Sequence, residues 1–359
     1  LVRGGHWSDA LGCYLTLAEI VSVQGRLSAA ADIYAEAWTH ATSDGTRRGA
    51  ADVRVGIAEI ALERGDLEAA RENLEAARAL GEPLGLPRYA GRSRAVAALL
   101  AEAQGDLTGA LDLLAEAQQV HLGDFSPDVR PLRAATVRVQ LRLGDLEAAE
   151  AWARERNLDV DDPLTYLREF EHLTYAEVLL ARHRLAGGTA ARADAVSLLQ
   201  RLVDASTAGG RVAAAIDGLV LLSLAADDLA ALGRAVELAA PDGWKRPFTR
   251  HGSLLAAPLS ALVRQPGSSA YAATLLAAVG PAVDERAVLS GGLVDPLSAR
   301  ELEVLGLLAS DLDGPEIARH LFLSLNTVRT HTKRIYTKLD VTSRRAAVRR
   351  GRELGLIPG

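Results

Sequence analysis

The sequence predicts an all-α fold, in which a solenoid of stacked helical hairpins precedes a small module of four helices. A glycine-led motif recurs about every 40 residues, which is typical of repeats built from helix pairs. β-Branched and polar residues do not alternate along the chain, and aromatic residues are only 4% of it, so no strand is expected. The charge also changes sign near the C-terminus, which indicates that the two parts have different partners.

The repeat motif has four clear copies and two faint ones. The clear copies read Gly-Asp-Leu or Gly-Arg-Leu at their start, and the six copies begin at Gly25, Gly65, Gly105, Gly144, Gly188 and Gly233. In each copy the glycine supplies the left-handed backbone that ends one helix, and the aspartate caps the next. The motif therefore predicts the turn inside each of about six helical hairpins.

Apolar residues on both sides of the motif keep the spacing of one helical face. Val53, Ile57 and Ile60 precede the second copy, and Leu74 and Ala77 follow it. Since one hairpin cannot bury its own apolar face, the hairpins are expected to stack on their neighbours and to form a concave surface.

A carboxylate cluster, Asp159-Val-Asp-Asp-Pro163, interrupts the repeats. One interpretation is a metal or acid–base site. No histidine and no second group of carboxylates stand at ligand spacing, however. The sequence therefore favours the other interpretation, a solvated loop that leads to a helix start.

Charge separates the two parts of the chain. The whole protein has a net charge of −6, yet residues 296–359 carry 11 Arg and Lys against 7 Asp and Glu. Within 319–352 the count is 10 against 1. An acidic body with a basic terminal module is typical of proteins that bind nucleic acid. We therefore predict two domains, 1–285 and 296–359, joined by a linker at 286–295.

Helix caps divide the C-terminal module into its elements. Ser298 and Glu301 have the spacing of a capping box, and so have Asp313 and Glu316, so a helix is expected to begin at each pair. Ser324 then caps a third, longer helix, and a fourth helix follows it. The short second helix and the third helix form a helix-turn-helix motif, whose second helix enters the major groove of double-stranded DNA.

The third helix has two different faces. Its buried stripe is predicted at Val328, Thr332, Ile335 and Leu339. The opposite face and its flanks carry long cations and small polar groups, and the candidate DNA-contacting residues are Asn326, Thr327, Arg329, Thr330, Lys333, Arg334 and Lys338. The helix-turn-helix motif is predicted at about Gly314 to Lys333. An alternative is a solvated arginine-rich face, which explains the charge but neither the caps nor the turn that accompany it.

The candidate residues are expected to share the work of DNA binding. Arginine and lysine both neutralise phosphate, but arginine is better shaped for bidentate contact with guanine. Because Arg329, Thr330 and Lys333 lie one turn apart on the outer face, we expect them to contact base edges. The flanking candidates are expected to contact the phosphate backbone, with Asn326 fitting either group: Thr327, Arg334 and Lys338.

The C-terminal module resembles the LuxR-type helix-turn-helix domain. The segments that carry the resemblance are Leu297-Ser-Ala-Arg-Glu-Leu-Glu-Val-Leu, Glu316-Ile-Ala, Leu323-Ser-Leu-Asn-Thr-Val-Arg-Thr-His and Ile335-Tyr-Thr-Lys-Leu-Asp-Val341. Before Glu316 the chain departs from the family pattern, because the usual glycine, hydroxyl cap and Asn-Lys are replaced by Asp311, Asp313, Gly314 and Pro315. Asp313 is still able to cap, so the resemblance implies the family's four-helix fold, with a fourth helix that supports dimerisation.

The body of the chain also resembles known proteins. Its hairpins are similar to tetratricopeptide-like arrays, and residues 239–252 resemble the segment that closes the array in MalT-like regulators, the large ATP-binding members of the LuxR family. Those regulators place an NTPase domain before the repeats. No Gly-x-x-x-x-Gly-Lys-Ser/Thr motif occurs in this sequence, so such a domain would lie outside this chain. The resemblance implies that the repeats bind a small inducer or a partner protein, and it indicates no particular residues for that role.

These features favour a bacterial transcription regulator that pairs as a homodimer or oligomer on DNA, and they allow RNA polymerase as a further partner. The alternative is a protein-binding repeat scaffold that is tethered to DNA without regulating promoters. An enzyme is disfavoured, because the eight histidines are scattered and neither His-Glu-x-x-His nor Gly-x-Ser-x-Gly occurs. We expect no metal and no cofactor.

The sequence also bears on localisation. Cys13 is the only cysteine, and neither a secretory signal nor a run of about 20 apolar residues occurs. We therefore expect a cytoplasmic protein without membrane contact.

Overall fold

The computed structural model describes residues 7–43, 48–81, 85–120, 129–186, 189–280, 297, 299–310, 312–321, 325–339, 341–353 and 356–357. Every regular element in these ranges is a helix, so the predicted all-α fold is confirmed. The chain divides into two compact units, the first from Leu1 to Pro281 and the second from Ala282 to Gly359. The predicted linker at 286–295 lies outside the described residues.

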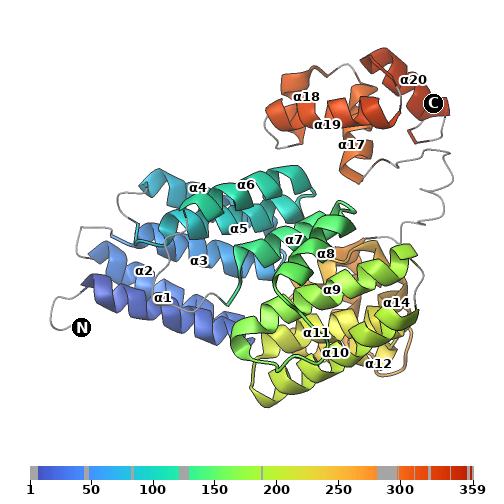
Figure 1. The fold of residues 1–359 in the computed structure, drawn as a ribbon. Helices are drawn as coiled ribbons and strands as arrows, with labels where there is room; N and C mark the ends of the chain where they lie inside the picture. The colour runs from blue at the N-terminus through green and yellow to red at the C-terminus, as the bar shows by residue number, and fades with distance from the viewer. Residues whose placement is uncertain are drawn as a thin grey trace. The chain divides into compact units, whose positions relative to one another are not determined.

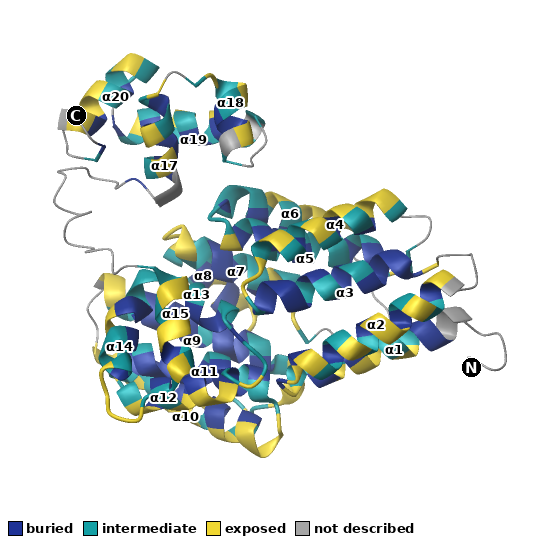
Figure 2. Cartoon of the chain, turned by 180° about the vertical axis from the view of Figure 1, so that it is seen from behind, coloured by how far each residue is buried: buried dark blue, intermediate teal, exposed yellow. Residues whose placement is uncertain are grey.

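Six helical hairpins make up most of the first unit (Figure 1). They pair α1 (Trp7–Val23) with α2 (Leu27–Ser43), α3 (Ala50–Glu63) with α4 (Leu67–Leu80), α5 (Tyr89–Ala103) with α6 (Leu107–Val120), α7 (Leu132–Arg142) with α8 (Leu146–Glu155), α9 (Glu169–Ala186) with α10 (Thr189–Ala208), and α11 (Val212–Ala226) with α12 (Leu229–Ala239). The helices carry their buried residues on the sides that face other helices (Figure 2). The predicted stacking of neighbouring hairpins is confirmed, because α3 packs on α2 and α5 as well as on α4.

The clear copies of the motif form the turns that the sequence predicts. Gly25, Gly65, Gly105 and Gly144 all have positive φ values, between 71° and 84°. The aspartates that follow three of these glycines cap the next helix, with side-chain oxygens that accept hydrogen bonds from backbone N–H groups at 2.9 to 3.1 Å; they are Asp66, Asp106 and Asp145. Left-handed backbone and a side-chain cap therefore occur together at three of these four turns.

The prediction of a turn at Gly233 is wrong. Gly233 lies inside α12, and the turn between α11 and α12 stands at Asp227, which has a φ of 55°. Asp228 then caps α12 by accepting hydrogen bonds from Ala230 N and Ala231 N at 2.8 and 3.1 Å. Aspartate is one of the few residues besides glycine that adopts this backbone readily, so a search for glycine misses the turn. The other faint copy, at Gly188, lies outside the described residues.

The carboxylate cluster forms a loop that leads into a helix. Its Asp162 Oδ2 lies 3.1 Å from the Nε2 atom of His172, whose ring is fully buried in α9. The Nδ1 atom of His172 lies 3.0 Å from the backbone oxygen of Arg168, in the short 3-10 helix η3 (Tyr166–Arg168). In the described ranges no group of three or more His, Cys, Asp or Glu residues has the geometry of a metal site. The contacts to His172 and Arg168 place the cluster in a loop that leads into η3 and α9.

After the sixth hairpin, the chain returns to the first two hairpins. We call residues 239–252 the closing segment, and it contains the short helix α13 (Arg246–Thr249). The Nε1 atom of Trp244 donates a hydrogen bond to Gly25 O at 2.9 Å, and Lys245 N donates to Glu63 O at 2.8 Å. The helices α14 (Ser253–Val263) and α15 (Ala270–Val279) follow, and one apolar core extends from α1 to α15. The array is thus closed on itself, because its first and last parts are in contact.

Gly56→Ala is expected to destabilise the first unit by about 1–3 kcal/mol, because a methyl group there would overlap the ring of Tyr34. That ring is only 2% exposed, and its hydroxyl accepts a hydrogen bond from Arg92 Nη2 at 2.9 Å, so it has little freedom to move aside. Urea unfolding followed by tryptophan fluorescence measures the effect. The matched control is Gly12→Ala in α1, where a Cβ would have no neighbour within 4 Å and alanine should stabilise the helix by up to about 1 kcal/mol. Equal effects of the two substitutions would contradict the prediction.

Among the described helices, none is both long enough and apolar enough to cross a lipid bilayer.

Candidate nucleic-acid interface

Four helices form the described part of the second unit. They are α17 (Ala299–Leu308), α18 (Gly314–His320), α19 (Leu325–Lys338) and α20 (Arg344–Glu353). Their shared core contains Leu305, Ile317, Ile335 and Ala347, one residue from each helix, all fully buried. This core fixes α18 and α19 against each other and against α17, so the side chains of α19 project from a rigid support.

The capping box at the start of α18 is confirmed. The Oδ1 atom of Asp313 accepts a hydrogen bond from Glu316 N at 2.8 Å, and Asp313 N donates to Glu316 Oε2 at 2.8 Å. Pro315 stands in the first turn, where a backbone N–H group would have no acceptor within the helix, so the N–H that proline lacks is not missed. Asp313, which belongs to the departure from the usual family pattern, therefore supports the start of the helix, whereas Asp311 lies outside the described residues. The other two predicted caps, Ser298 and Ser324, lie outside the described residues.

The two faces of α19 are arranged as its periodicity predicts. Val328, Ile335 and Leu339 are buried, whereas Thr332 is half-buried and donates its hydroxyl hydrogen to Val328 O at 2.8 Å. His331 joins the core with 4% of its surface exposed. One face of α19 is therefore used for folding, which leaves the opposite face available for a partner.

The candidate residues lie on the opposite face of α19 and on its flanks. Arg329 and Lys333 are exposed, and the candidates that are half-buried are Thr327, Thr330, Arg334 and Lys338. Asn326 lies in α19, but its side chain is outside the described part of the chain. The helix thus brings the two exposed cations together one turn apart, as expected for a surface that faces DNA.

Lys338 also has a role that the sequence does not reveal. Its Nζ atom lies 3.0 Å from Glu301 Oε2 in α17, and the side chains of Lys338 and Glu301 are 19% and 4% exposed. A charge buried to this extent is stable only when it is paired. The ion pair therefore links the end of α19 to the start of α17.

Arg344 is a further residue that the sequence analysis missed. Its guanidinium group donates hydrogen bonds to the backbone oxygens of Leu308, Ser310 and Leu312, at 2.9, 2.6 and 2.7 Å. These oxygens lie at the end of α17 and in the connection to α18, where a cation is favoured. Arg344 thereby positions the segment just before the capping box.

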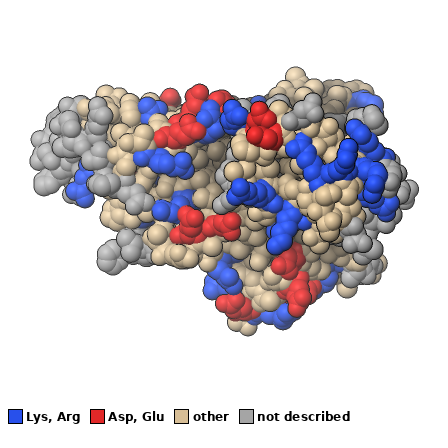
Figure 3. Space-filling model, turned by 90° about the horizontal axis from the view of Figure 1, so that it is seen from above, with Lys and Arg blue, Asp and Glu red and all other residues tan. Residues whose placement is uncertain are grey.

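Other cations of α20 face solvent. Arg345, Arg349 and Arg352 are exposed, and their spacing places them on one side of the helix. On the face of the molecule drawn in Figure 3, Lys and Arg side chains form several groups, and Asp and Glu side chains lie beside some of these groups. Three exposed arginines on one side of α20 attract a polyanion over a longer range than a single cation does.

Comparison with known proteins gives two family matches. Residues 1–265 match the family described as the MalT-like TPR region, and residues 295–350 match the luxR family of bacterial regulatory proteins. A stretch of 52 residues is 50% identical to the probable transcriptional regulatory protein NarL of Mycobacterium tuberculosis, in strain CDC 1551 / Oshkosh and in strain ATCC 25618 / H37Rv. That stretch is 14% of this chain and 24% of each relative, so the chain matches about a quarter of the relatives' length.

Proposed function

This chain belongs to the MalT-like TPR family and carries a C-terminal domain of the luxR family of bacterial regulatory proteins, and from this premise we propose that it is a DNA-binding transcription regulator whose repeats sense an effector or a partner. The observation that carries the proposal is α19, a helix whose buried side is fixed by a compact core and whose other side is basic. Such a helix at the second position of a helix-turn-helix motif fits the major groove.

The candidate residues are proposed to contact DNA in two ways. Arg329, Thr330 and Lys333 contact base edges, since they lie on the outer face near the start of α19. The flanking residues Thr327 and Arg334 contact phosphate oxygens. Lys338 and Asn326 complete the proposed set. The ammonium group of Lys338 forms an ion pair with Glu301.

The repeats are proposed to change how the C-terminal domains of two or more chains pair on DNA. The closed array supports this role, because a ligand that binds near the closing segment contacts the first and the last hairpins at once. A ligand that bridges these hairpins would bind the closed array more tightly than an open one, and such a difference in affinity is what shifts a conformational equilibrium. We further propose that such a regulator acts in the bacterial cytoplasm, with RNA polymerase as a further partner.

Arg329→Ala is expected to weaken binding to the specific site by about 1–3 kcal/mol and to relax the preference at one base position, because a base-edge contact is lost. A first round of selection from random DNA identifies the site. Binding is then measured across all its single-base variants at several salt concentrations. Arg334→Ala serves as the matched variant, and it should weaken binding to all sequences alike and lower the salt slope by about one unit.

The opposite pattern would contradict the assignment of the two groups. If Arg334→Ala changes the base preference and Arg329→Ala does not, then α19 lies in the groove at another rotation. The same measurements address the scaffold alternative. A regulator should bind its site about 10³-fold or more tighter than random DNA, whereas a scaffold that is only tethered to DNA should show little difference.

A further inference from the structure

The connection between α17 and α18 contains no glycine, although a helix ends there. Residues 307–313 read Leu-Leu-Ala-Ser-Asp-Leu-Asp. In the first unit, Gly25, Gly65 and Gly105 adopt positive φ values at the ends of α1, α3 and α5, which lets the chain turn there. A helix leaves its last C=O groups without a partner inside the helix. The end of α17 therefore depends on donors from another part of the chain.

Arg344, the first residue of α20, supplies these donors. Its Nε atom donates a hydrogen bond to Leu308 O at 2.9 Å, and its Nη1 atom donates to Leu312 O at 2.7 Å. Its Nη2 atom donates to Ser310 O at 2.6 Å, between the other two acceptors in sequence. A planar guanidinium group has its donors on three separate atoms, which an ammonium group does not. One side chain therefore fixes the connection at both of its ends.

The helix α20 is a firm support for this side chain. Ala347, about one turn after Arg344, is fully buried in the core of the second unit. Gly351 lies so close to α17 that a Cβ there would stand 2.9 Å from the Leu305 side chain. The glycine thus lets the two helices approach each other, and close packing resists their displacement. The guanidinium group is held by α20 and transmits that position to the connection.

The start of α18 has little other support. This helix has seven residues, and only Ile317 and Ala318 are buried among its described side chains. Asp313, which caps the helix, is exposed. The capping box closes the helix end itself but does not attach it to a neighbouring helix. The hydrogen bond from Arg344 to Leu312, the residue before the cap, therefore fixes the place where α18 begins.

Two polar links hold the helix-turn-helix motif, α18 and α19, to the rest of the unit. The helix α18 packs more on α19 than on α17, so the two helices form one block. At the end of α19, Lys338 Nζ lies 3.0 Å from Glu301 Oε2. At the start of α18, Arg344 holds the connection. A side chain that reads a base edge has to be placed within about 0.5 Å, so a small rotation of the block would break such contacts.

We propose that Arg344 is a positioning residue for DNA recognition, because it fixes the start of α18 and thereby the angle at which α19 enters the major groove. It acts through α18 and not by touching a base. Attraction to phosphate depends less on angle than a bidentate hydrogen bond to a base does, so the loss of Arg344 should reduce sequence preference more than affinity for DNA in general. This inference rests on the proposed function, since it names what sets the specificity of the proposed site.

The test measures the affinity of the full chain for its selected site and for random DNA at one salt concentration. Arg344→Gln is expected to lower the ratio of the two affinities at least about tenfold, because base-edge contacts are lost. Arg345→Gln is the matched control, since it removes the same charge from an exposed side chain of the same helix. It should lower both affinities alike and leave their ratio unchanged. If Arg344→Gln also leaves the ratio unchanged, the proposal is overturned.

A second variant separates geometry from charge and from stability. Arg344→Lys keeps the charge, but one ammonium group cannot reach three oxygens along the connection, so the ratio should fall by about threefold or more. A variant that is only less stable has fewer folded molecules and loses both affinities in proportion, which leaves the ratio as it was. Arg344→Lys also carries the test if Arg344→Gln does not fold. An unchanged ratio in folded Arg344→Lys would overturn the positioning role.

Hydrogen exchange and the unsubstituted chain complete the test. Peptides from the end of α17 and from α18 should exchange faster in Arg344→Gln than in Arg345→Gln, and equal exchange would overturn the claim that Arg344 holds the connection. If the unsubstituted chain prefers no site over random DNA, the proposed function fails and this inference fails with it. If the unsubstituted chain has a high ratio and both variants of Arg344 keep it, this inference alone fails.

Discussion

Lys338→Ala is expected to destabilise the second unit by about 3–5 kcal/mol, because it removes the ammonium group that neutralises a buried carboxylate. Glu301 is 4% exposed and lies 3.0 Å from Lys338 Nζ. Because Lys338 keeps 19% of its surface exposed, water can reach the edge of the site, and the lower part of the range is the better expectation. The double variant Glu301→Leu/Lys338→Met should restore most of the stability, since two apolar groups of similar size need no partner.

Amide hydrogen exchange in the full chain measures this effect locally. Peptides from α17 and α19 should exchange faster in Lys338→Ala, whereas peptides from the first unit should not change. Lys333→Ala is the matched control, because Lys333 is an exposed lysine of the same helix. If the two lysine variants exchange alike, the ion pair does not hold α19 to α17.

The role of Lys338 at the DNA backbone stays a prediction, and it needs a different variant. Alanine changes folding and charge together, so a loss of DNA affinity would have two causes. Glu301→Gln/Lys338→Gln keeps two groups that can form a hydrogen bond, and it removes both charges. A salt slope lower by about one unit in this double variant would indicate a phosphate contact by Lys338.

The faces of α19 could be predicted because they depend on local spacing alone. Val328, Ile335 and Leu339 recur at the period of a helix, and the structure buries all three. The same period places Lys338 beside this buried stripe. Whether a lysine in that position turns inward depends on a carboxylate in α17, 37 residues earlier in the chain. The sequence shows both residues but not their contact.

The hairpin turns show a similar limit. Four glycines with aspartate or arginine after them predicted four turns, since positive φ and a cap have a strong sequence signal. The turn at Asp227 has no glycine, and the glycine at position 233 lies inside a helix, where it has only a modest cost. The repeat pattern therefore located the turns that keep the glycine, and it misplaced the turn at which Asp227 adopts the left-handed backbone instead.

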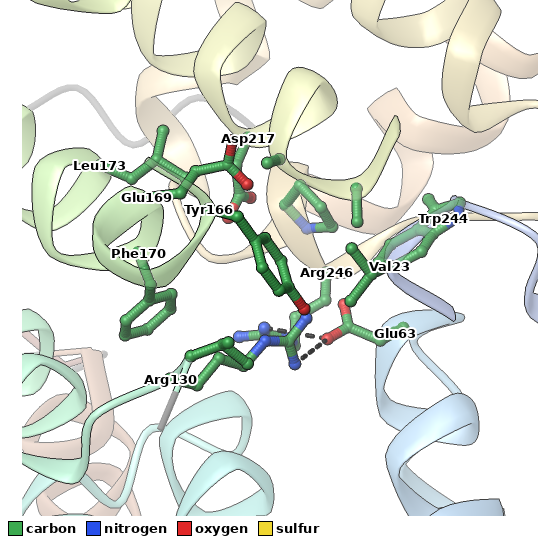
Figure 4. A pocket seen from close by; sticks show the side chains of 14 residues that line it. Val23, Glu63, Arg130, Tyr166, Glu169, Phe170, Leu173, Asp217, Trp244 and Arg246 are labelled. Atoms are coloured by element: carbon green, nitrogen blue, oxygen red, sulfur yellow. Dashed lines mark hydrogen bonds and ion pairs between the residues drawn. The ribbon is translucent and has the colours of Figure 1, made fainter. Parts of the chain in front are cut away.

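The closure of the array was beyond what the repeats could predict. A repeat pattern describes how each hairpin contacts its neighbours, whereas Trp244 and Gly25 are 219 residues apart. The resemblance of residues 239–252 to a closing segment predicted an end to the array but not its contact with the first two hairpins. A pocket lined by Val23, Glu63, Trp244 and Arg246 was missed for the same reason, because this contact brings these residues together (Figure 4).

Trp244→Ala is expected to destabilise the first unit by about 3–5 kcal/mol, which is typical of removing a large buried aromatic side chain. Trp244 is 2% exposed, and its Nε1 atom donates the 2.9 Å hydrogen bond to Gly25 O at the end of α1. Trp244→Phe keeps most of the apolar contact and removes the hydrogen bond, so it should cost about 1–3 kcal/mol, because Gly25 O loses a partner.

The location of the effect distinguishes closure from ordinary packing. In an open array, each hairpin contacts only its neighbours, so a core substitution should loosen only the helices around it. Trp152→Ala is the matched control, since Trp152 is 3% exposed and packs in the core formed around α7, α8 and α9. Hydrogen exchange should rise only near those helices in the control. In Trp244→Ala it should rise together in α1, α2 and the closing segment, although these lie at opposite ends of the array in sequence. If α1 and α2 stay as protected as they are in the unsubstituted chain, the hydrogen bond to Gly25 does not couple the two ends, and the array behaves as an open solenoid.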